Sequence, residues 1–185
     1  MKRFEVKLLG VGGQGIRMAG EILGRAATND GKFATHWQSY GVETRGGPST
    51  SEVVVSDEKI VYPRVTFADI MAATDRAVLR RHIHELKPGG LLLVDLDLVG
   101  DEILRGDVQI RKIPMAKIAN ELGQRMVVNM VMLGALQGLT EIVTKDIFLK
   151  TIRESVPNSM EEVNVKAFLI GMEKAKIGDV TGKYE

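Results

Sequence analysis

The sequence predicts an α/β fold, a three-layer α/β/α sandwich around a mixed, mostly parallel sheet. Three observations lead to this class. Short apolar segments alternate with segments of helical periodicity along the chain. The chain opens with a Rossmann-like strand, glycine-rich loop and helix. Two neighbouring segments have the pattern of a β-hairpin, which places an antiparallel pair in the sheet.

The expected strands are short runs of apolar residues bounded by turn residues. They are 4–9, 32–38, 51–55, 60–62, 91–94 and 108–113. The hairpin joins 51–55 to 60–62. The segment 91–94 has no polar alternation, so we expect a strand that is buried on both faces.

The first helix is expected after the glycine-rich loop, because apolar residues recur there at 16, 19, 22, 23 and 26. A second helix is expected to end at 87–90, and a third begins after Pro114. The segment 127–142 is apolar nearly all round, which predicts a helix that is buried or covered by a partner. Two more helices close the chain.

Composition and charge limit the classes of protein. The chain has 185 residues, 44% hydrophobic and 26% charged, which fits one soluble domain over residues 1–185. Lys and Arg number 25 against 24 for Asp and Glu, so no strong field favours nucleic acid. The most apolar stretch, 126–139, contains Asn129 and Gln137 and is shorter than the ~20 residues of a membrane helix. The charged start is not typical of a signal peptide, so we expect a cytoplasmic protein with no membrane partner.

The chain contains no cysteine. Disulfides, zinc–thiolate clusters, thiol nucleophiles and iron–sulfur centres on this chain's own thiolates are therefore excluded. Any electron carrier for redox chemistry is expected on another chain.

Several catalytic and metal-binding patterns fail on spacing. His82 and His84 would lie about 200° apart around a helix and cannot share a metal. The acidic run from Asp95 resembles a calcium loop, but Val99 and Gly106 stand where oxygen ligands are needed. No nucleophile elbow or P-loop lysine occurs. We therefore expect a binding or assembly component rather than an autonomous enzyme.

The first glycine-rich loop has the G-x-G-x-x-G pattern at positions 10, 12 and 15. Free amides at the start of the following helix favour an anion by about 0.3–1 kcal/mol. A dinucleotide also requires a ribose-binding acid about 20 residues later, and residues 35–39 contain neither an acid nor an arginine. A free-standing dinucleotide-binding oxidoreductase is thus an alternative hypothesis. Gln14 has two interpretations: it donates to a ligand or neighbouring subunit, or it caps the turn.

The second glycine-rich segment, 40–47, combines an aromatic residue, an acid and a base with three glycines. Loops of this composition usually bind a ligand or partner. Arg45 offers five donors to a phosphate or carboxylate. Its other interpretation is a salt bridge to Glu43 or another acid that holds the loop in place.

Both loops and several later segments resemble the gamma subunit of 2-oxoacid:ferredoxin oxidoreductases, over most of the chain. The pairing of the GGQG loop with the E-x-R-G-G loop is more specific than the first loop alone. The matching segments are Gly10-Val11-Gly12-Gly13-Gln14-Gly15, Ala19-Gly20-Glu21-Ile22-Leu23, Ser39-Tyr40-Gly41, Glu43 with Arg45-Gly46-Gly47, Ser51-Glu52-Val53, Ser56-Asp57, Leu86-Lys87-Pro88-Gly89-Gly90, Ile113-Pro114, Ile118-Ala119, Asn129-Met130, Leu133-Gly134-Ala135 and Val165-Lys166-Ala167-Phe168.

The resemblance implies a non-autonomous subunit of a thiamine diphosphate enzyme that converts a 2-oxoacid and coenzyme A to acyl-CoA and CO2 and reduces ferredoxin. It implies that no cofactor is bound by this chain alone. Thiamine diphosphate, magnesium and iron–sulfur clusters are expected on partner subunits, and coenzyme A is expected as a shared ligand. The implied partners are the alpha and beta subunits, a ferredoxin-like delta subunit and, indirectly, ferredoxin.

The resemblance places a set of loop residues at the cofactor cleft or against the catalytic subunits, and it implies no catalytic proton-transfer residue on this chain. The loop residues are Gly12, Gly13, Gln14, Gly15, Tyr40, Glu43, Arg45, Gly46 and Gly47.

The chain departs from the family pattern at two positions of the second loop. Val42 stands where proline is expected and Pro48 where a small residue is usual. The run 51–58 with Tyr62-Pro63 resembles the 2-oxoglutarate branch more than the pyruvate branch. A pyruvate- or indolepyruvate-type gamma subunit is the alternative within the family, and a purely structural interaction module is the third hypothesis.

Overall fold

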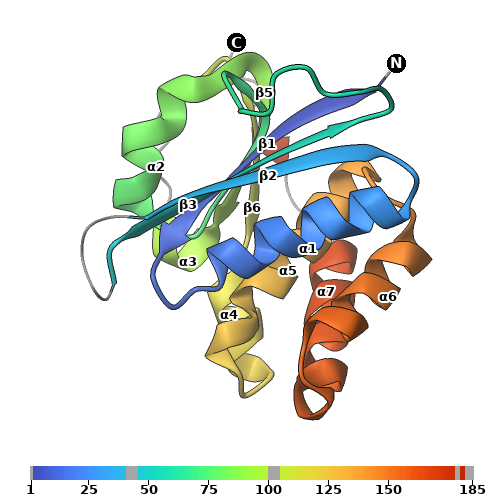
Figure 1. Cartoon of the computed structure of the whole chain (residues 1–185). Helices are drawn as coiled ribbons and strands as arrows, with labels where there is room; N and C mark the ends of the chain where they lie inside the picture. The colour runs from blue at the N-terminus through green and yellow to red at the C-terminus, as the bar shows by residue number, and fades with distance from the viewer. Residues whose placement is uncertain (1, 41–45, 100–104, 178–179, 182–185) are drawn as a thin grey trace.

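The computed structural model describes residues 2–40, 46–99, 105–177 and 180–181. Its centre is a seven-stranded sheet in the order β2-β3-β1-β4-β5-β6-β7 (Figure 1). The strands are β1 (Arg3–Val11), β2 (Phe33–Tyr40), β3 (Pro48–Ser56), β4 (Ala68–Ala73), β5 (Leu86–Asp95), β6 (Gln109–Ile113) and β7 (Val180–Thr181). The strands β1, β4, β5 and β6 run parallel to one another, whereas β3 is antiparallel to β1 and β2, and β7 is antiparallel to β6. The predicted mixed sheet is confirmed, with parallel pairing in its centre and antiparallel pairing towards both edges.

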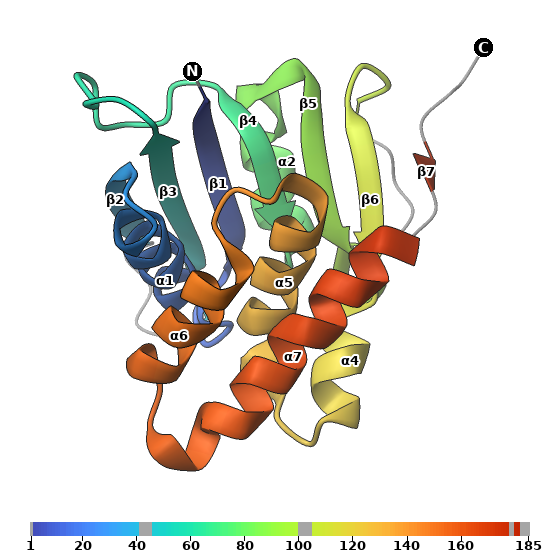
Figure 2. The ribbon, with the colours of Figure 1, turned by 90° about the vertical axis from the view of Figure 1, so that its right-hand side faces the viewer.

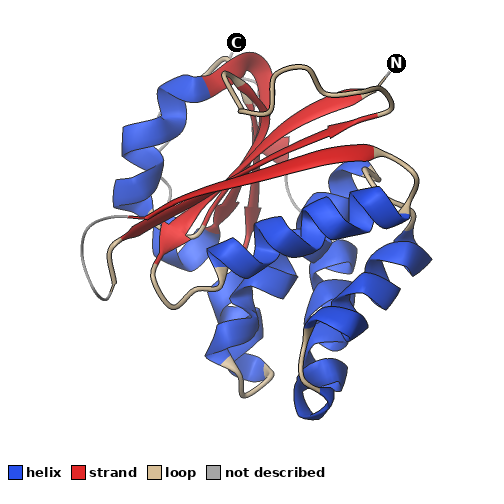
Figure 3. Ribbon diagram, in the orientation of Figure 1, coloured by secondary structure: helices blue, strands red, loops and turns tan. Residues whose placement is uncertain are grey.

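Helices cover both faces of the sheet, which confirms the predicted three layers (Figure 2, Figure 3). The helices are α1 (Ile16–Asn29), α2 (Arg76–His82), α3 (Leu96–Val99), α4 (Met115–Glu121), α5 (Val128–Thr140), α6 (Lys145–Ser155) and α7 (Asn158–Ile177), with 3-10 turns η1 (Ile83–Glu85) and η2 (Arg125–Val127). One face carries α1, α4, α5, α6 and α7, and the other carries α2. A large apolar cluster lies under the first group and includes Leu8 and Val53. A smaller cluster, with Leu9 and Val54, lies under α2.

The alternation along β1 and β3 explains how both faces of the sheet are buried. Successive side chains of a strand point to opposite faces, so Leu8 faces α1 and Leu9 faces α2. The predicted periodicity of the first helix is also confirmed, because its residues at 16, 19, 22, 23 and 26 are all buried.

One strand pairing differs from the prediction. The segment 60–62 is not a strand, and β3 pairs instead with β2 on one side and β1 on the other. Val53 and Val55 face α1 while Val54 faces α2, so β3 is buried on both faces, as is typical of an inner strand of the sheet. The segment after β3 crosses beside β2, where the Arg64 guanidinium lies 4.5 Å from the ring centroid of Trp37.

A second difference concerns the residues expected to end the second helix. Residues 87–90 lie within β5, which starts at Leu86. The amide of Gly89 donates to the carbonyl of Asp107 over 2.7 Å, so this glycine-containing turn is tied to the residues just before β6.

The predicted burial of α5 is confirmed, and α7 of this chain provides part of the cover. Residues 128–137 are all buried. A Cβ at Gly134 would overlap the carbonyl oxygen of Phe168 in α7, and a Cβ at Gly171 would overlap that of Val131 in α5. Glycines therefore allow the backbones of α5 and α7 to touch. Among the described residues, no helix is both long and apolar enough to cross a membrane.

We expect Gly134→Ala to lower the free energy of unfolding by about 1–3 kcal/mol, because the added methyl group has no space between α5 and α7. The matched control is Gly106→Ala, where an added Cβ meets nothing within 4 Å. Its effect should stay within about 0.5 kcal/mol. Urea unfolding followed by circular dichroism measures both variants, and equal stabilities would contradict the close contact of the two helices.

Candidate functional site

The two glycine-rich segments meet at one end of the sheet. The first follows β1, the second leads into β3, and the antiparallel register places Val11 opposite Pro48. The amide of Gly12 donates to the carbonyl of Gly47 over 2.9 Å. A Cβ at Gly12 would stand 3.2 Å from the nitrogen of Gly46, so the absence of a side chain permits this approach. The described parts of both loops therefore form one surface.

Two glycines of the first loop have left-handed backbone conformations, with φ of 94° at Gly13 and 70° at Gly15. Gly15 is the N-cap of α1, and a Cβ there would overlap the side-chain amide of Asn129 in α5. Backbone conformation and packing are sufficient to explain these glycines. The helix they introduce has no side-chain hydrogen bond at its N-cap, which leaves its first amides available.

Gln14 caps the turn from within. Its Oε1 accepts a hydrogen bond from the amide of Val11 over 2.8 Å and another from the hydroxyl of Thr74 over 2.9 Å. Its Nε2 donates to the carbonyl of Thr74 over 3.3 Å. A Cβ at Gly10 would come within 2.6 Å of both Gln14 Oε1 and Thr74 Oγ1. Of the two interpretations of Gln14, the geometry shows the cap.

The Gln14–Thr74 contacts also close the crevice where Rossmann-like folds bind dinucleotides. Such ligands bind at the carboxyl ends of two parallel strands whose following helices lie on opposite faces. Here those strands are β1 and β4, followed by α1 and α2. The strand on the other side of β1 is antiparallel β3, so β2 is not next to β1 to bind a ribose. Both features argue against a free-standing dinucleotide-binding oxidoreductase.

The middle of the second loop lies outside the described residues. Tyr40 is the last residue of β2, and Gly46, with φ of 72°, and Gly47 precede β3. Glu43 and Arg45 fall in the range 41–45, which is not described. Both interpretations of Arg45, anion binding and a salt bridge, stay predictions.

A buried oxygen atom beside the start of α1 lacks a donor. Asn129 is only 2% exposed; its Nδ2 donates to the carbonyl of Gly15 over 3.2 Å, and its Oδ1 has no hydrogen-bond partner among the described residues. The Oε1 of Gln38, on β2, is buried and unpaired in the same way. An unpaired buried acceptor costs about 1–3 kcal/mol. The sequence signal that could have singled out Asn129 is its polar side chain in a largely apolar helix.

A group of charged side chains, which we call the Lys7 cluster, lies on the α2 face of the sheet and consists of Lys7, Glu52, Arg64, His82 and Glu85. Lys7 is buried and contacts the carboxylate of Glu85 and, at 3.4 Å, that of Glu52. Arg64 donates to Glu52 from Nε at 2.8 Å and from Nη2 at 3.3 Å. Nδ1 of His82 lies 2.8 Å from Oε1 of Glu85. This cluster could not be predicted from local patterns, because its members come from separate elements; the local signal is a charged residue next to buried apolar neighbours, Lys7 between Val6 and Leu8 and Glu52 before Val53.

Hydrogen bonds and opposite charges keep both acids of the Lys7 cluster ionised. Burial pushes the pKa of Glu52 upward, but the hydrogen bonds from Arg64 and the charge of Lys7 outweigh it and hold the pKa below its ordinary value of 4.5. Burial also pushes the pKa of Glu85 upward, but the hydrogen bonds and charges of Lys7 and His82 outweigh it, so the pKa lies below its ordinary value. The two carboxylates thus compensate the buried ammonium group.

Asp95, at the end of β5, caps neighbouring helices. Its carboxylate accepts hydrogen bonds of 2.6–2.9 Å from the amides of Asp97, Leu98 and Ala116. Burial raises its pKa despite these bonds. In the part of the chain that the structure describes, no three His, Asp or Glu side chains are placed to hold a metal ion.

Known proteins match this chain along nearly its whole length. A family model described as pyruvate ferredoxin/flavodoxin oxidoreductase matches residues 5–174. The 2-oxoglutarate synthase subunit KorC of Methanocaldococcus jannaschii is 49% identical over 177 residues, 94% of this chain and 95% of that protein. The pyruvate synthase subunit PorC of Methanothermobacter marburgensis is 33% identical over 175 residues, 93% of this chain and 97% of that protein. The crystal structure of a keto/oxoacid ferredoxin oxidoreductase gamma subunit from Geobacter sulfurreducens PCA has a TM-score of 0.83 at 39% identity, covering 94% of this chain and 99% of that chain.

We expect Gln14→Ala to destabilise the isolated chain by about 1–3 kcal/mol, because it leaves the Val11 amide without its acceptor and leaves the Thr74 hydroxyl only the longer contact with the carbonyl of Leu9. The control is Gln124→Ala, at an exposed position whose side chain makes no cap hydrogen bond. Urea unfolding of both variants provides the comparison. If Gln14→Ala is as stable as the control, Gln14 is not a structural cap.

We expect Glu52→Gln to lower the free energy of unfolding by about 2 kcal/mol at pH 7, because it removes charged hydrogen bonds from Arg64 and Lys7. The folded-state pKa of Glu52 is depressed, so its contribution is fully present above about pH 4.5 and is lost as the pH falls through the folded value. The stability difference between wild type and Glu52→Gln should therefore shrink below pH 4.5. The control is Glu58→Gln, at an exposed position. If the stability difference between wild type and Glu52→Gln does not change with pH, Glu52 is not paired as a carboxylate with Arg64 and Lys7.

Proposed function

This chain belongs to the pyruvate ferredoxin/flavodoxin oxidoreductase family, and on that basis we propose that it is the gamma subunit of a cytoplasmic 2-oxoglutarate:ferredoxin oxidoreductase. The observation that carries the substrate is the 49% identity to a 2-oxoglutarate synthase subunit along 95% of that protein. Identity to the pyruvate synthase subunit is 33% over a similar length. The reaction converts 2-oxoglutarate and coenzyme A to succinyl-CoA and CO2, and two electrons pass to ferredoxin.

The division of work between subunits follows from the residues of this chain. It has no cysteine, so its side chains do not fit an iron–sulfur cluster, which belongs to a partner subunit. The assignment of thiamine diphosphate and magnesium to the alpha and beta subunits rests on the resemblance to the family alone. A ferredoxin-like delta subunit is the further partner in this proposal, and ferredoxin interacts with the complex rather than with this chain directly.

The joined glycine loops fit coenzyme A as a ligand shared with the partner subunits. Phosphate groups require donors, and the start of α1 offers backbone amides without a side-chain cap. The unpaired Oδ1 of Asn129 beside Gly15 would accept from an N–H or O–H group of coenzyme A rather than contact its phosphates. When bound, coenzyme A supplies the thiol that receives the acyl group. The space beside Gly13, where an added Cβ meets nothing within 4 Å, would let coenzyme A approach the loop backbone, while Gln14 holds the loop in shape.

The proposal predicts that the isolated chain does not reduce ferredoxin with 2-oxoglutarate and coenzyme A, whereas the complex assembled with its co-expressed alpha and beta subunits does. Leaving this chain out of the co-expression should abolish that activity. Turnover is measured with 2-oxoglutarate and pyruvate side by side. Activity of the isolated chain, or a complex that prefers pyruvate, would contradict the proposal.

Within the assembled complex, Arg45→Ala should raise the KM for coenzyme A about tenfold or reduce co-purification of the chain, because a charge-assisted donor is removed. Arg153→Ala is the control, since Arg153 pairs with Glu161 at the α6–α7 end of the molecule. If Arg45→Ala has the wild-type KM for coenzyme A and co-purifies as the wild-type chain does, Arg45 takes no part in ligand binding or assembly.

A further inference from the structure

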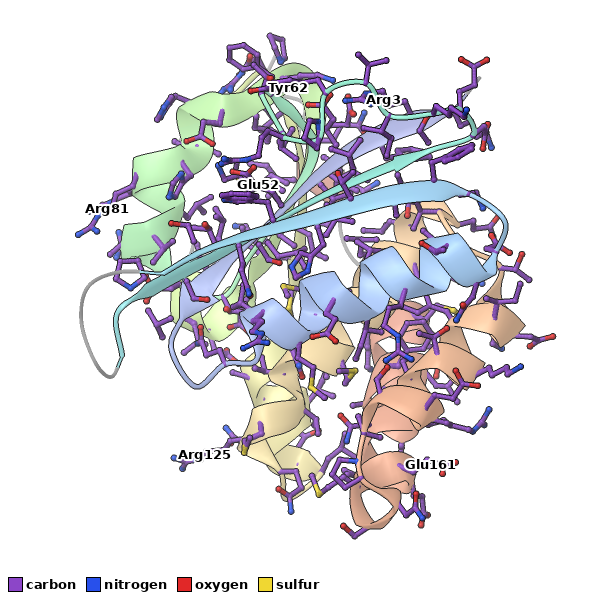
Figure 4. All side chains as sticks on the ribbon, viewed as in Figure 1. Arg3, Glu52, Tyr62, Arg81, Arg125 and Glu161 are labelled. Atoms are coloured by element: carbon purple, nitrogen blue, oxygen red, sulfur yellow. The ribbon has the colours of Figure 1, made fainter. Side chains whose placement is uncertain are left out.

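The Lys7 cluster borders a cavity of about 530 Å³ on the α2 face of the sheet. Lys7, Thr50 and Glu52 form the floor from β1 and β3. Arg81, His82 and Glu85 from α2 and η1 form one wall, and the segment 64–66 forms another. In Figure 4, Glu52 lies between the sheet and α2, and Arg81 projects from α2 at the outer rim.

The two carboxylates that line this cavity already accept hydrogen bonds. Glu52 accepts from Arg64, Lys7 and, at 3.4 Å, the amide of Val65. Glu85 accepts from Lys7 and contacts His82. Neither carboxylate is therefore available as the main contact for a cationic ligand.

The polar side chains left over can all act as donors. The guanidinium of Arg81 and the hydroxyl of Thr50 make no hydrogen bond or ion pair with any described residue. Arg64 uses Nε and Nη2 on Glu52, and no contact of its Nη1 with a described residue is found. Lys7, Arg64 and Arg81 carry three positive charges against the two negative charges of Glu52 and Glu85, so the cavity has a surplus of positive charge even when His82 is neutral.

We propose that this cavity binds a small molecule through a phosphate or carboxylate group, which Arg81 and Thr50 contact from opposite sides. An oxyanion accepts several hydrogen bonds and complements the surplus charge. The volume lies in the range of small-molecule sites, about 300–1,000 Å³, and exceeds what a single phosphate fills. The ligand is therefore a larger molecule that ends in an oxyanion.

Ser39 and Pro48, at the two ends of the second glycine-rich segment, also line this cavity, but the cavity lies on the other face of the sheet from the first helix. The start of α1 lies on the opposite face of the sheet from α2. Thr50 and Lys7 belong to the strand positions that alternate with the residues facing α1. The inference thus does not depend on the identity of the complex, and either proposal can fail alone.

The test is titration of the full chain with inorganic phosphate and, separately, with 2-oxoglutarate at constant ionic strength. Calorimetry measures affinity, and amide NMR locates the contact. We expect at least one of the two probes to bind and to shift the amide signals of Thr50 and His82. Failure of both probes to bind, or shifts confined to residues 12–17, would overturn the site.

Three variants test whether Arg81 and Thr50 contact the bound probe. Arg81→Ala should weaken binding of that probe about tenfold, as expected for loss of a hydrogen bond to a charged group. Arg80→Ala removes the same charge from the same helix outside the cavity lining and should change affinity less than about twofold. Thr50→Val keeps the side-chain size within β3 and should weaken binding several-fold. Equal effects of Arg80→Ala and Arg81→Ala, or full affinity in Thr50→Val, would overturn the assignment.

Discussion

The antiparallel pairing of β3 with β1 is the interaction on which the rest of the structure depends. Its register runs from Arg3 opposite Ser56 to Val11 opposite Pro48. A shift by one residue would turn every side chain of β3 to the other face of the sheet. The observed register places Val53 against the α1 layer, places Val54 under α2, and sets Lys7 directly opposite Glu52.

The same pairing joins the two glycine-rich loops and leaves no place for a dinucleotide's ribose beside β1. Because β3 occupies the edge of β1 that a second parallel strand would need, a ribose site cannot form beside β1. The end of β1 instead faces the residues that lead into β3, and the Gly12 amide bonds to Gly47. Gln14 then fills the crevice towards β4. A pattern shared with dinucleotide-binding proteins thus forms a compact loop surface at the start of α1.

Sequence reasoning succeeded where the determining interactions are local. The periodic apolar residues of α1 and the apolar segment of α5 specify helices through neighbours three and four positions apart. It failed for the hairpin of 51–55 with 60–62, because nothing local distinguishes a following strand from the more distant β1 and β2 as partners of β3. The Lys7 cluster was missed for the same reason, since Lys7 and Glu85 are 78 positions apart. The role of Gln14 stayed open until Thr74, 60 positions away, was placed beside it.

The α/β class, the absence of thiol chemistry on this chain and the two glycine-rich loops of its family can all be read from the amino-acid sequence. These properties depend on residue type, spacing and short-range periodicity, which are present in the unfolded chain. Only the tertiary structure decided that the two loops touch, that Gln14 is a cap and that a buried lysine sits between two carboxylates beside a cavity. Those properties are distances between residues far apart along the chain, and strand register and helix packing are what set them.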